Sequence, residues 1–130
     1  MSQLDSLTPP DDHDCNEHGF TFNGYQREAH SMACYDGESY PWLALAEEVG
    51  EVVTFQSKKE RGDDMITRYG SEGNIRNALV KELGDVLWMV SEIATQRGIS
   101  MQEVANSNIH KLKIRRQENT LKGSDEHDRS

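Results

Sequence analysis

Two short motifs contain the carboxylates that are best placed to do chemistry in this sequence. The first lies in "LALAEEVGEVV" and contains Glu47, Glu48 and Glu51. The second, "ELGD", contains Glu82 and Asp85 at a spacing of i,i+3. On an α-helix, either spacing brings the carboxylates to one side, so each motif can present several oxygens together.

The first motif has an apolar stripe beside it. Helical periodicity places these apolar residues on one side of the helix: Trp42, Leu45, Ala46, Val49, Val52 and Val53. The three glutamates fall on the other side, which by itself predicts an ordinary solvated face. Like charges at these spacings repel by roughly 0.2–0.5 kcal/mol per pair, however. No basic residue relieves this repulsion on that face before Lys58 or Lys59, so the patch favours a cation.

The second motif precedes "LWMV" (87–90), which is apolar nearly all round. This pattern predicts a deeply buried helix, packed against a second subunit. Buried carboxylates need partners or a metal, and no arginine obviously belongs to that face. Oxygen-only ligands select Mg²⁺, with Mn²⁺ as a possible substitute. A di-iron site typically adds Glu-x-x-His, which this sequence lacks, and its helical histidines, His30 and His110, lie elsewhere.

Mg²⁺ in an acidic helical cleft would suit a nucleoside triphosphate, whose phosphates bare carboxylates would repel. Near the C-terminal end, "NSNIHKLKIRR" places Asn108, Lys111 and Arg115 near one helix face. These side chains could hold the outlying phosphates. A second interpretation stays open, because cations are favoured near any helix C-terminus.

The elements that must position these residues are all helices. The expected helices cover 23–35, 40–60, 74–97 and 101–118. Capping boxes are expected at Asn23 with Gln26 and at Ser100 with Glu103, and 61–73 is expected to be a connecting loop. No segment alternates as a strand would. The sequence therefore predicts an all-α, four-helix-type bundle subunit that assembles into an oligomeric helical bundle.

Composition restricts the remaining possibilities. The chain has 130 residues, enough for one domain. Acidic residues outnumber basic ones 23 to 14, which argues against binding a nucleic acid polymer. No apolar run suits a membrane span, no signal peptide pattern is present, and the two cysteines have no zinc-type spacing. We therefore expect no membrane partner and a cytoplasmic location.

The expected domain covers 20–118, between two tails. Residues 1–19 are predicted to be an acidic flexible tail, and 119–130 a polar one. The first tail contains "DDHDCNEH", which has metal-ligand residue types but no spacing that fits a closed site.

The two acidic motifs in this order resemble the E-E-x-x-E and E-x-x-D signature of the MazG-like, all-α nucleoside triphosphate pyrophosphohydrolases. The likeness extends to "LALAEEVGEV" and "NSNIHKLKIRR", and covers roughly 23–116. It implies a Mg²⁺-dependent enzyme that hydrolyses (deoxy)nucleoside triphosphates to a nucleoside monophosphate and pyrophosphate, as a homodimer or homotetramer. It also implies that the cytoplasm is that of a bacterial cell or a phage-infected host, where small single-domain members of the family occur.

The same resemblance implies roles for individual residues. The implied metal ligands are Glu48, Glu51, Glu82 and Asp85. Glu47 would orient or deprotonate the attacking water, or hold a further metal. The implied phosphate contacts are Lys111, Arg115 and Asn108.

The base pocket is expected in the segment before the first motif, where Gln26, His30 and Tyr35 are candidates. A different class of function stays open at this point. The chain could be a non-catalytic helical module whose acidic face binds a metal or a basic partner.

Overall fold

The computed structural model of this chain describes residues 21–121, and every element in that range is a helix. The helices are α2 (Phe22–Ser31), α3 (Tyr40–Glu60), α4 (Met65–Tyr69), α5 (Glu72–Gln96) and α6 (Met101–Leu121). The predicted all-α class is confirmed, with one helix more than expected. None of the described helices is long and apolar enough to cross a membrane.

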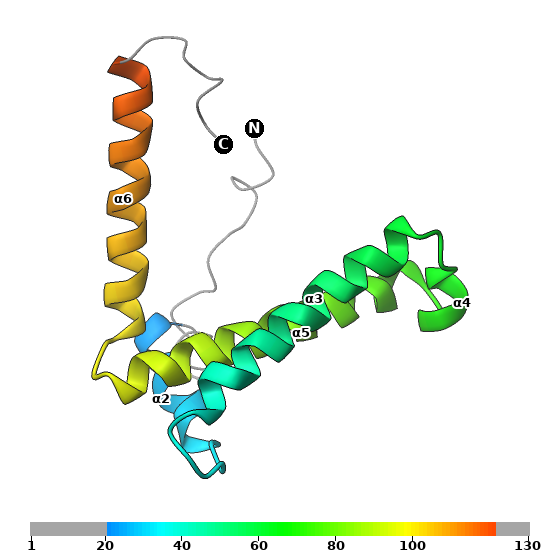
Figure 1. The fold of residues 1–130 in the computed structure, drawn as a ribbon, viewed down its shortest axis with the longest axis horizontal. Coiled ribbons are helices and arrows are strands. Elements are labelled where there is room, and N and C mark those ends of the chain that lie inside the picture. Colours follow the sequence, from blue (N-terminus) through cyan, green and yellow to red (C-terminus); the bar gives the residue numbers. More distant parts are fainter. Residues whose placement is uncertain (1–20, 122–130) are drawn as a thin grey trace.

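The framework of the subunit is the pair of long helices α3 and α5, which lie side by side and run in opposite directions (Figure 1). Pro41 stands in the first turn of α3, where its missing N–H costs no hydrogen bond. The hydroxyl of Ser71 caps α5 by accepting from the N–H of Asn74, at 3.1 Å. After α5 the chain turns at Gly98, whose φ of 67° is one that glycine adopts readily. The predicted bounds of α3 are confirmed at both ends.

The connection between α3 and α5 contains the helix that was not predicted. We expected a loop over 61–73, but α4 begins after Asp64, which accepts from the backbone N–H of Thr67 at 3.1 Å. The helix has only five residues and depends on packing. Met65 is buried, and the ring of Tyr69 lies 5.8 Å from that of Phe55 on α3. These contacts close one end of the helix pair.

At the other end of the helix pair, α2 crosses α5 and packs against the beginning of α6 (Figure 1). The predicted capping box of α2 is wrong, because the helix begins one residue earlier and Thr21 is its cap. Asn23 and Gln26 instead accept from the backbone N–H groups of Gln102 and Met101, at 3.1 and 2.8 Å. The Ser100 hydroxyl also accepts from the N–H of Glu103, as predicted.

Three side chains therefore cap the first turn of α6, and two of them come from α2. Helix α6 itself stands away from the α3–α5 pair (Figure 1). It continues through Leu121, beyond the predicted end at 118. The predicted tail over 1–19, with its "DDHDCNEH" stretch, lies outside the described residues.

The predicted burial of the helix that contains "LWMV" is only partial in the single chain, and its packing against a second subunit stays a prediction. Met89 is buried, but Val80, Leu83 and Leu87 are 52%, 50% and 38% exposed. The N-terminal half of α5 packs on α3 and α4, which leaves its outer side uncovered.

Candidate metal centre

The side of α3 that turns toward α5 matches the predicted apolar stripe only in part, at Leu45 and Val52. The less exposed residues of α3 repeat every three or four positions: Pro41, Ala44, Leu45, Glu48, Val52 and Phe55. Trp42, Val49 and Val53 are exposed instead, at 46%, 43% and 60%. Glu48 thus belongs to the inner side of the helix, because it follows Ala44 and precedes Val52 by one turn each. Helical periodicity placed all three glutamates opposite the packed side of α3, and this placement is wrong for Glu48.

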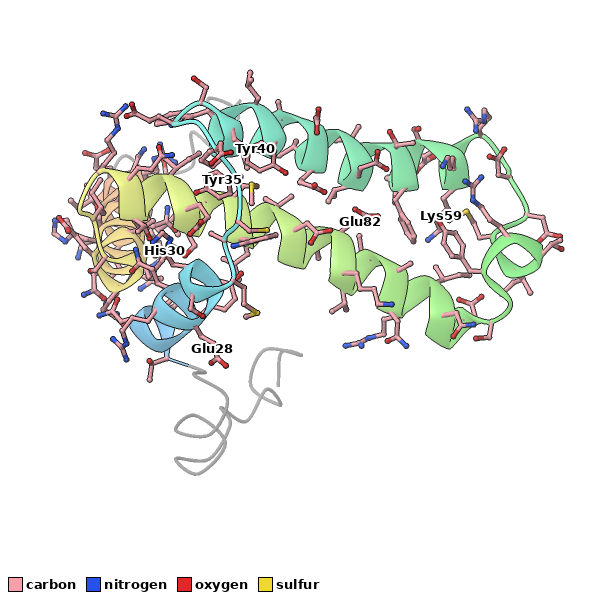
Figure 2. All side chains as sticks on the ribbon, turned by 90° about the horizontal axis from the view of Figure 1, so that it is seen from below. Glu28, His30, Tyr35, Tyr40, Lys59 and Glu82 are labelled. Atoms are coloured by element: carbon pink, nitrogen blue, oxygen red, sulfur yellow. The ribbon has the colours of Figure 1, made fainter. Side chains whose placement is uncertain are left out.

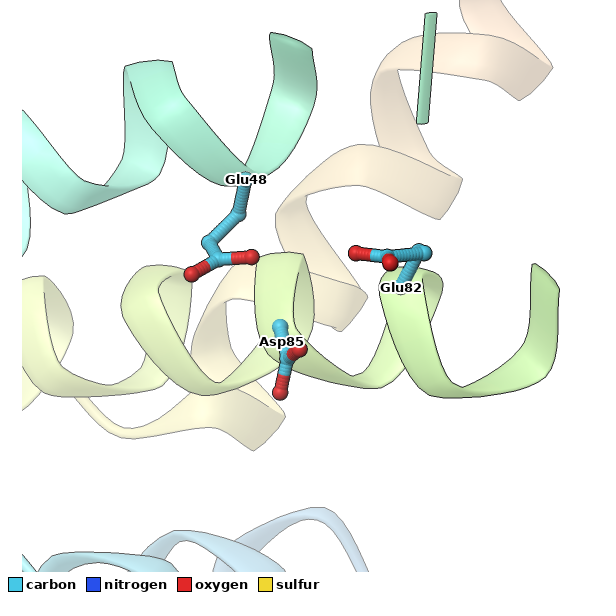
Figure 3. A group of neighbouring side chains, drawn as sticks. All are labelled: Glu48, Glu82 and Asp85. Atoms are coloured by element: carbon cyan, nitrogen blue, oxygen red, sulfur yellow. The ribbon is translucent and has the colours of Figure 1, made fainter. Parts of the chain in front are cut away.

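Glu48 meets the second motif across the helix pair (Figure 3). Each of Glu48, Glu82 and Asp85 offers a carboxylate oxygen, and these oxygens all lie within 4.8 Å of one another. We call these three residues the acidic triad. Glu48 and Glu82 are partly buried and Asp85 is exposed. Within residues 21–121, no hydrogen-bond donor or basic side chain pairs with any of the three.

The electrostatics of the triad centre on Glu48. Desolvation by burial raises the pKa of Glu48, and the charges of Asp85, Glu82, Glu51 and Glu47 raise it further. The other four carboxylates of the two motifs therefore all raise the pKa of Glu48. A cation at this position would relieve both the desolvation and the repulsion.

The donor chemistry of the triad fits a hard divalent cation. Carboxylate oxygens are the ligands that Mg²⁺ and Mn²⁺ take in proteins. The close approach of three acidic side chains without a basic partner is also the arrangement that a bound cation would stabilise.

Glu47 and Glu51 lie near the triad but outside it. Both side chains are exposed, and neither belongs to the group within 4.8 Å. The structure therefore brings together three of the four predicted metal ligands.

The predicted phosphate contacts on α6 are not brought to the triad of their own chain. Asn108 and Lys111 line a depression of about 400 Å³ with residues of the α5–α6 turn and α6, and no triad carboxylate borders it. Arg115 lies one turn farther along α6. Since α6 stands away from the helix pair (Figure 1), these residues do not share a site with the triad within one subunit.

The three base-pocket candidates are engaged in contacts within the subunit. The Gln26 amide nitrogen donates to Thr95 Oγ1 at 3.1 Å and to the carbonyl of Ile99 at 2.9 Å. His30 and Tyr35 instead meet at Glu92, a residue that the sequence reasoning missed (Figure 2 shows His30 and Tyr35).

Glu92 has no exposed surface at all. Its carboxylate accepts from the Tyr35 hydroxyl at 2.8 Å, and Nδ1 of His30 lies 3.0 Å from its other oxygen. Burial raises the pKa of Tyr35 to about 12, and the hydrogen bond to Glu92 adds to this effect, so the hydroxyl remains a donor. The available signal was a single carboxylate in the apolar run "WMVSEIA". That signal does not tell which residues of α2 and the following turn would reach it.

Comparison with known proteins agrees with the geometry. The sequence model of the MazG nucleotide pyrophosphohydrolase domain family matches residues 39–120, which include both acidic motifs. The Gene 37 protein of Mycobacterium phage L5 is 32% identical over 89 residues, covering 68% of this chain and 75% of that protein. No solved structure matches the chain. With its all-α fold and with both motifs inside the matched region, this chain belongs to the MazG nucleotide pyrophosphohydrolase family.

Proposed function

We propose that this protein hydrolyses nucleoside triphosphates, with deoxynucleotides as the first candidates, to a nucleoside monophosphate and pyrophosphate. The observation that carries the proposal is the acidic triad, which lies inside the matched family region and lacks a basic partner among the described residues. Such a centre suits a substrate that arrives with a divalent cation.

The acidic triad would hold Mg²⁺, and Mn²⁺ could substitute. Glu51 is a further candidate ligand, because it lies one turn after Glu48 and its charge acts on that residue. When bound, Mg²⁺ would offset phosphate charge and polarise the phosphoryl oxygens. The carboxylates of the chain fix where that charge compensation occurs, so they also fix which phosphate is attacked.

In the proposed reaction, the oxygen of a water attacks the α-phosphorus in line with the oxygen that bridges to the β-phosphorus. The bond to the bridging oxygen breaks, and pyrophosphate leaves with the electron pair. Glu47 would accept the proton of the water or orient it. It is exposed and adjacent to Glu48, so solvent water can reach it.

We also propose that the active form is a homodimer or homotetramer. Large apolar side chains are exposed on both long helices, including Leu43 at 68% and Val53 at 60% on α3. A second copy could cover such surfaces. It could also bring Lys111, Arg115 and Asn108 of its α6 to the triad, which their own subunit does not do. The base pocket would then need residues other than Gln26, whose amide already has partners.

The direct test is product analysis. The protein is incubated with each common ribonucleoside and deoxyribonucleoside triphosphate in Mg²⁺, and the products are separated by ion-exchange chromatography. Monophosphate and pyrophosphate in equal amounts are expected for at least one nucleotide. Loss of only the terminal phosphate would contradict the proposed bond. No turnover by a helical, Mg²⁺-binding protein would favour a non-catalytic module.

A further inference from the structure

A polar depression borders the acidic triad on the side that faces α4. It is lined by Tyr69, Asn74, Asn77, Ala78, Lys81 and Glu82, and has a volume of about 340 Å³. Glu82 belongs both to this lining and to the triad. A molecule that binds at the triad can therefore extend into the depression without leaving the protein surface.

The floor of the depression is one stripe of α5. Asn74, Asn77, Ala78, Lys81 and Glu82 follow each other at helical spacing, so they share a side of the helix. Asn74 is already engaged, because its amide donates to the Tyr69 carbonyl at 2.8 Å and holds α4 against α5. The side chains of Asn77 and Lys81 have no hydrogen-bond or ion-pair partner in the described part of the chain.

The charge changes sign along this path. The triad is wholly acidic, whereas the next functional group toward α4 is the ammonium of Lys81. Lys58 and Lys59 in the last turn of α3 and Arg68 in the last turn of α4 lie at the same end of the helix pair but do not line the depression. The hydrogen bond from Arg61 lowers the pKa of the Asp63 carboxylate, and the charges of Arg68 and Lys58 act on it and lower it further. In Figure 2, Lys59 lies farther along the helix pair than Glu82, toward α4. An anion that extends from the triad into the depression meets the ammonium of Lys81, and a neutral base would gain nothing from that charge.

We infer that this depression is the subsite for the pyrophosphate end of the substrate, with Lys81 as a phosphate contact and Asn77 as an additional donor. This inference rests on the proposed function. The α-phosphate would lie at the triad, the β- and γ-phosphates would lie over Lys81, and the nucleoside would extend away from α4. Lys81 thus supplies, within one subunit, the positive charge that α6 of the same chain does not bring to the triad.

The test is the binding of the two product fragments, measured separately by isothermal titration calorimetry in Mg²⁺. The probes are inorganic pyrophosphate and the common nucleoside monophosphates. Lys81→Gln should weaken the binding of pyrophosphate about tenfold, which is typical for the loss of one charge-assisted phosphate contact. It should change the binding of a monophosphate less than twofold, and Lys81→Arg should restore most of the affinity for pyrophosphate.

The matched control is Arg76→Gln, which removes one positive charge from the opposite side of the same helix. It should leave both affinities unchanged, and circular dichroism should show equal helicity for all variants. Unchanged pyrophosphate binding in Lys81→Gln overturns the inference. Weaker monophosphate binding with normal pyrophosphate binding also overturns it, because the depression would then hold the nucleoside end.

Failure of this inference and failure of the proposed function are distinguishable. If wild-type protein forms monophosphate and pyrophosphate while Lys81→Gln binds pyrophosphate normally, only the subsite is wrong. If wild-type protein turns over no nucleotide, the proposed function is wrong, and a wild type that also fails to bind pyrophosphate overturns the subsite as well.

Discussion

Helix α5 contains two carboxylate sites that differ in whether hydrogen-bond donors reach the carboxylate oxygens. Glu92, toward its C-terminal end, is fully buried and has donors from Tyr35 and His30. Glu82 and Asp85, two to three turns earlier, meet Glu48 within 4.8 Å, and no donor of the described chain reaches these three. The more deeply buried carboxylate, Glu92, thus has hydrogen-bond partners, whereas the more accessible acidic triad has none among the described residues.

This difference distinguishes the buried structural carboxylate from the carboxylates that we propose to be functional. A chain that must bury a carboxylate for stability supplies donors for it, as α2 and the turn after it do for Glu92. A set of carboxylates without donors costs folding free energy through desolvation and repulsion, and a bound cation recovers that cost. Burial alone would therefore have pointed to Glu92 rather than to the proposed metal site on α5.

The largest expected effect is on catalysis at the triad. Asp85→Asn should lower turnover by a factor on the order of 10³, because it removes a charged ligand for the metal. The thermal midpoint should not fall, since the change also removes repulsion. Turnover and differential scanning fluorimetry measure the two quantities, with Glu28→Gln on exposed α2 surface as the control. Full activity in Asp85→Asn would refute the site, and Glu51→Gln tests in the same way whether Glu51 is a fourth ligand.

The opposite pattern is expected at Glu92. Glu92→Ala leaves the Tyr35 hydroxyl without its acceptor and opens a cavity, so the free energy of unfolding should fall by about 2–4 kcal/mol. Urea denaturation measures this loss. Tyr35→Phe removes a single hydrogen bond and should cost about 1 kcal/mol. Mg²⁺ affinity should stay unchanged in both variants. A large loss of that affinity would show that Glu92 and the acidic triad belong to one functional site.

A smaller effect of the opposite sign is expected at Glu48. Glu48→Gln should raise the unfolding free energy of the metal-free protein by up to about 1 kcal/mol, or roughly 4–8 °C in Tm. The wild type should gain stability when Mg²⁺ is added, whereas the variant should gain much less. A variant that is less stable than wild type in EDTA would show that Glu48 has a stabilising partner.

The smallest expected effect is the pH dependence of the difference in unfolding free energy between Glu48→Gln and wild type. The pKa of Glu48 is raised in the folded protein, so the group binds a proton on folding between its ordinary pKa and the raised one. Its contribution to stability is thus largest at low pH and declines as the pH rises through this window. The advantage of Glu48→Gln in EDTA should grow over the same window and then stay constant. An advantage that shrinks as the pH rises would contradict the raised pKa.

Helix type and most helix bounds could be predicted, because they depend on local signals. Pro41 and Gly98 mark where α3 begins and α5 gives way to a turn, and Ser100 caps α6 as expected. Helix α4 could not be predicted, since a five-residue helix is held by the packing of Tyr69 and Met65 rather than by its own propensity.

The site was predictable in its motifs but not in its geometry. The spacing of "ELGD" placed Glu82 and Asp85 together, but the apolar stripe assigned Glu48 to the wrong side of α3. An apolar stripe predicts the packed side of a helix only when all apolar side chains are covered within the subunit. On α3 several apolar side chains are exposed, so the stripe does not coincide with the side that packs on α5. The partners of Glu92 depend on how α2 crosses α5, which no local pattern encodes.

The capping of α6 by α2 has a mechanical consequence. Helix α6 has 21 residues and a length of roughly 30 Å, and its first turn is held by the side chains of Asn23 and Gln26. The Ser100 hydroxyl caps the same turn and Met101 is buried there, so α6 is held at one end and has the geometry of a lever. A rotation of about 10° at the held end would move the far end by roughly 5 Å for a rigid helix of that length. In a rigid helix, a small change in the orientation of α2 would thus become a larger displacement toward Arg115.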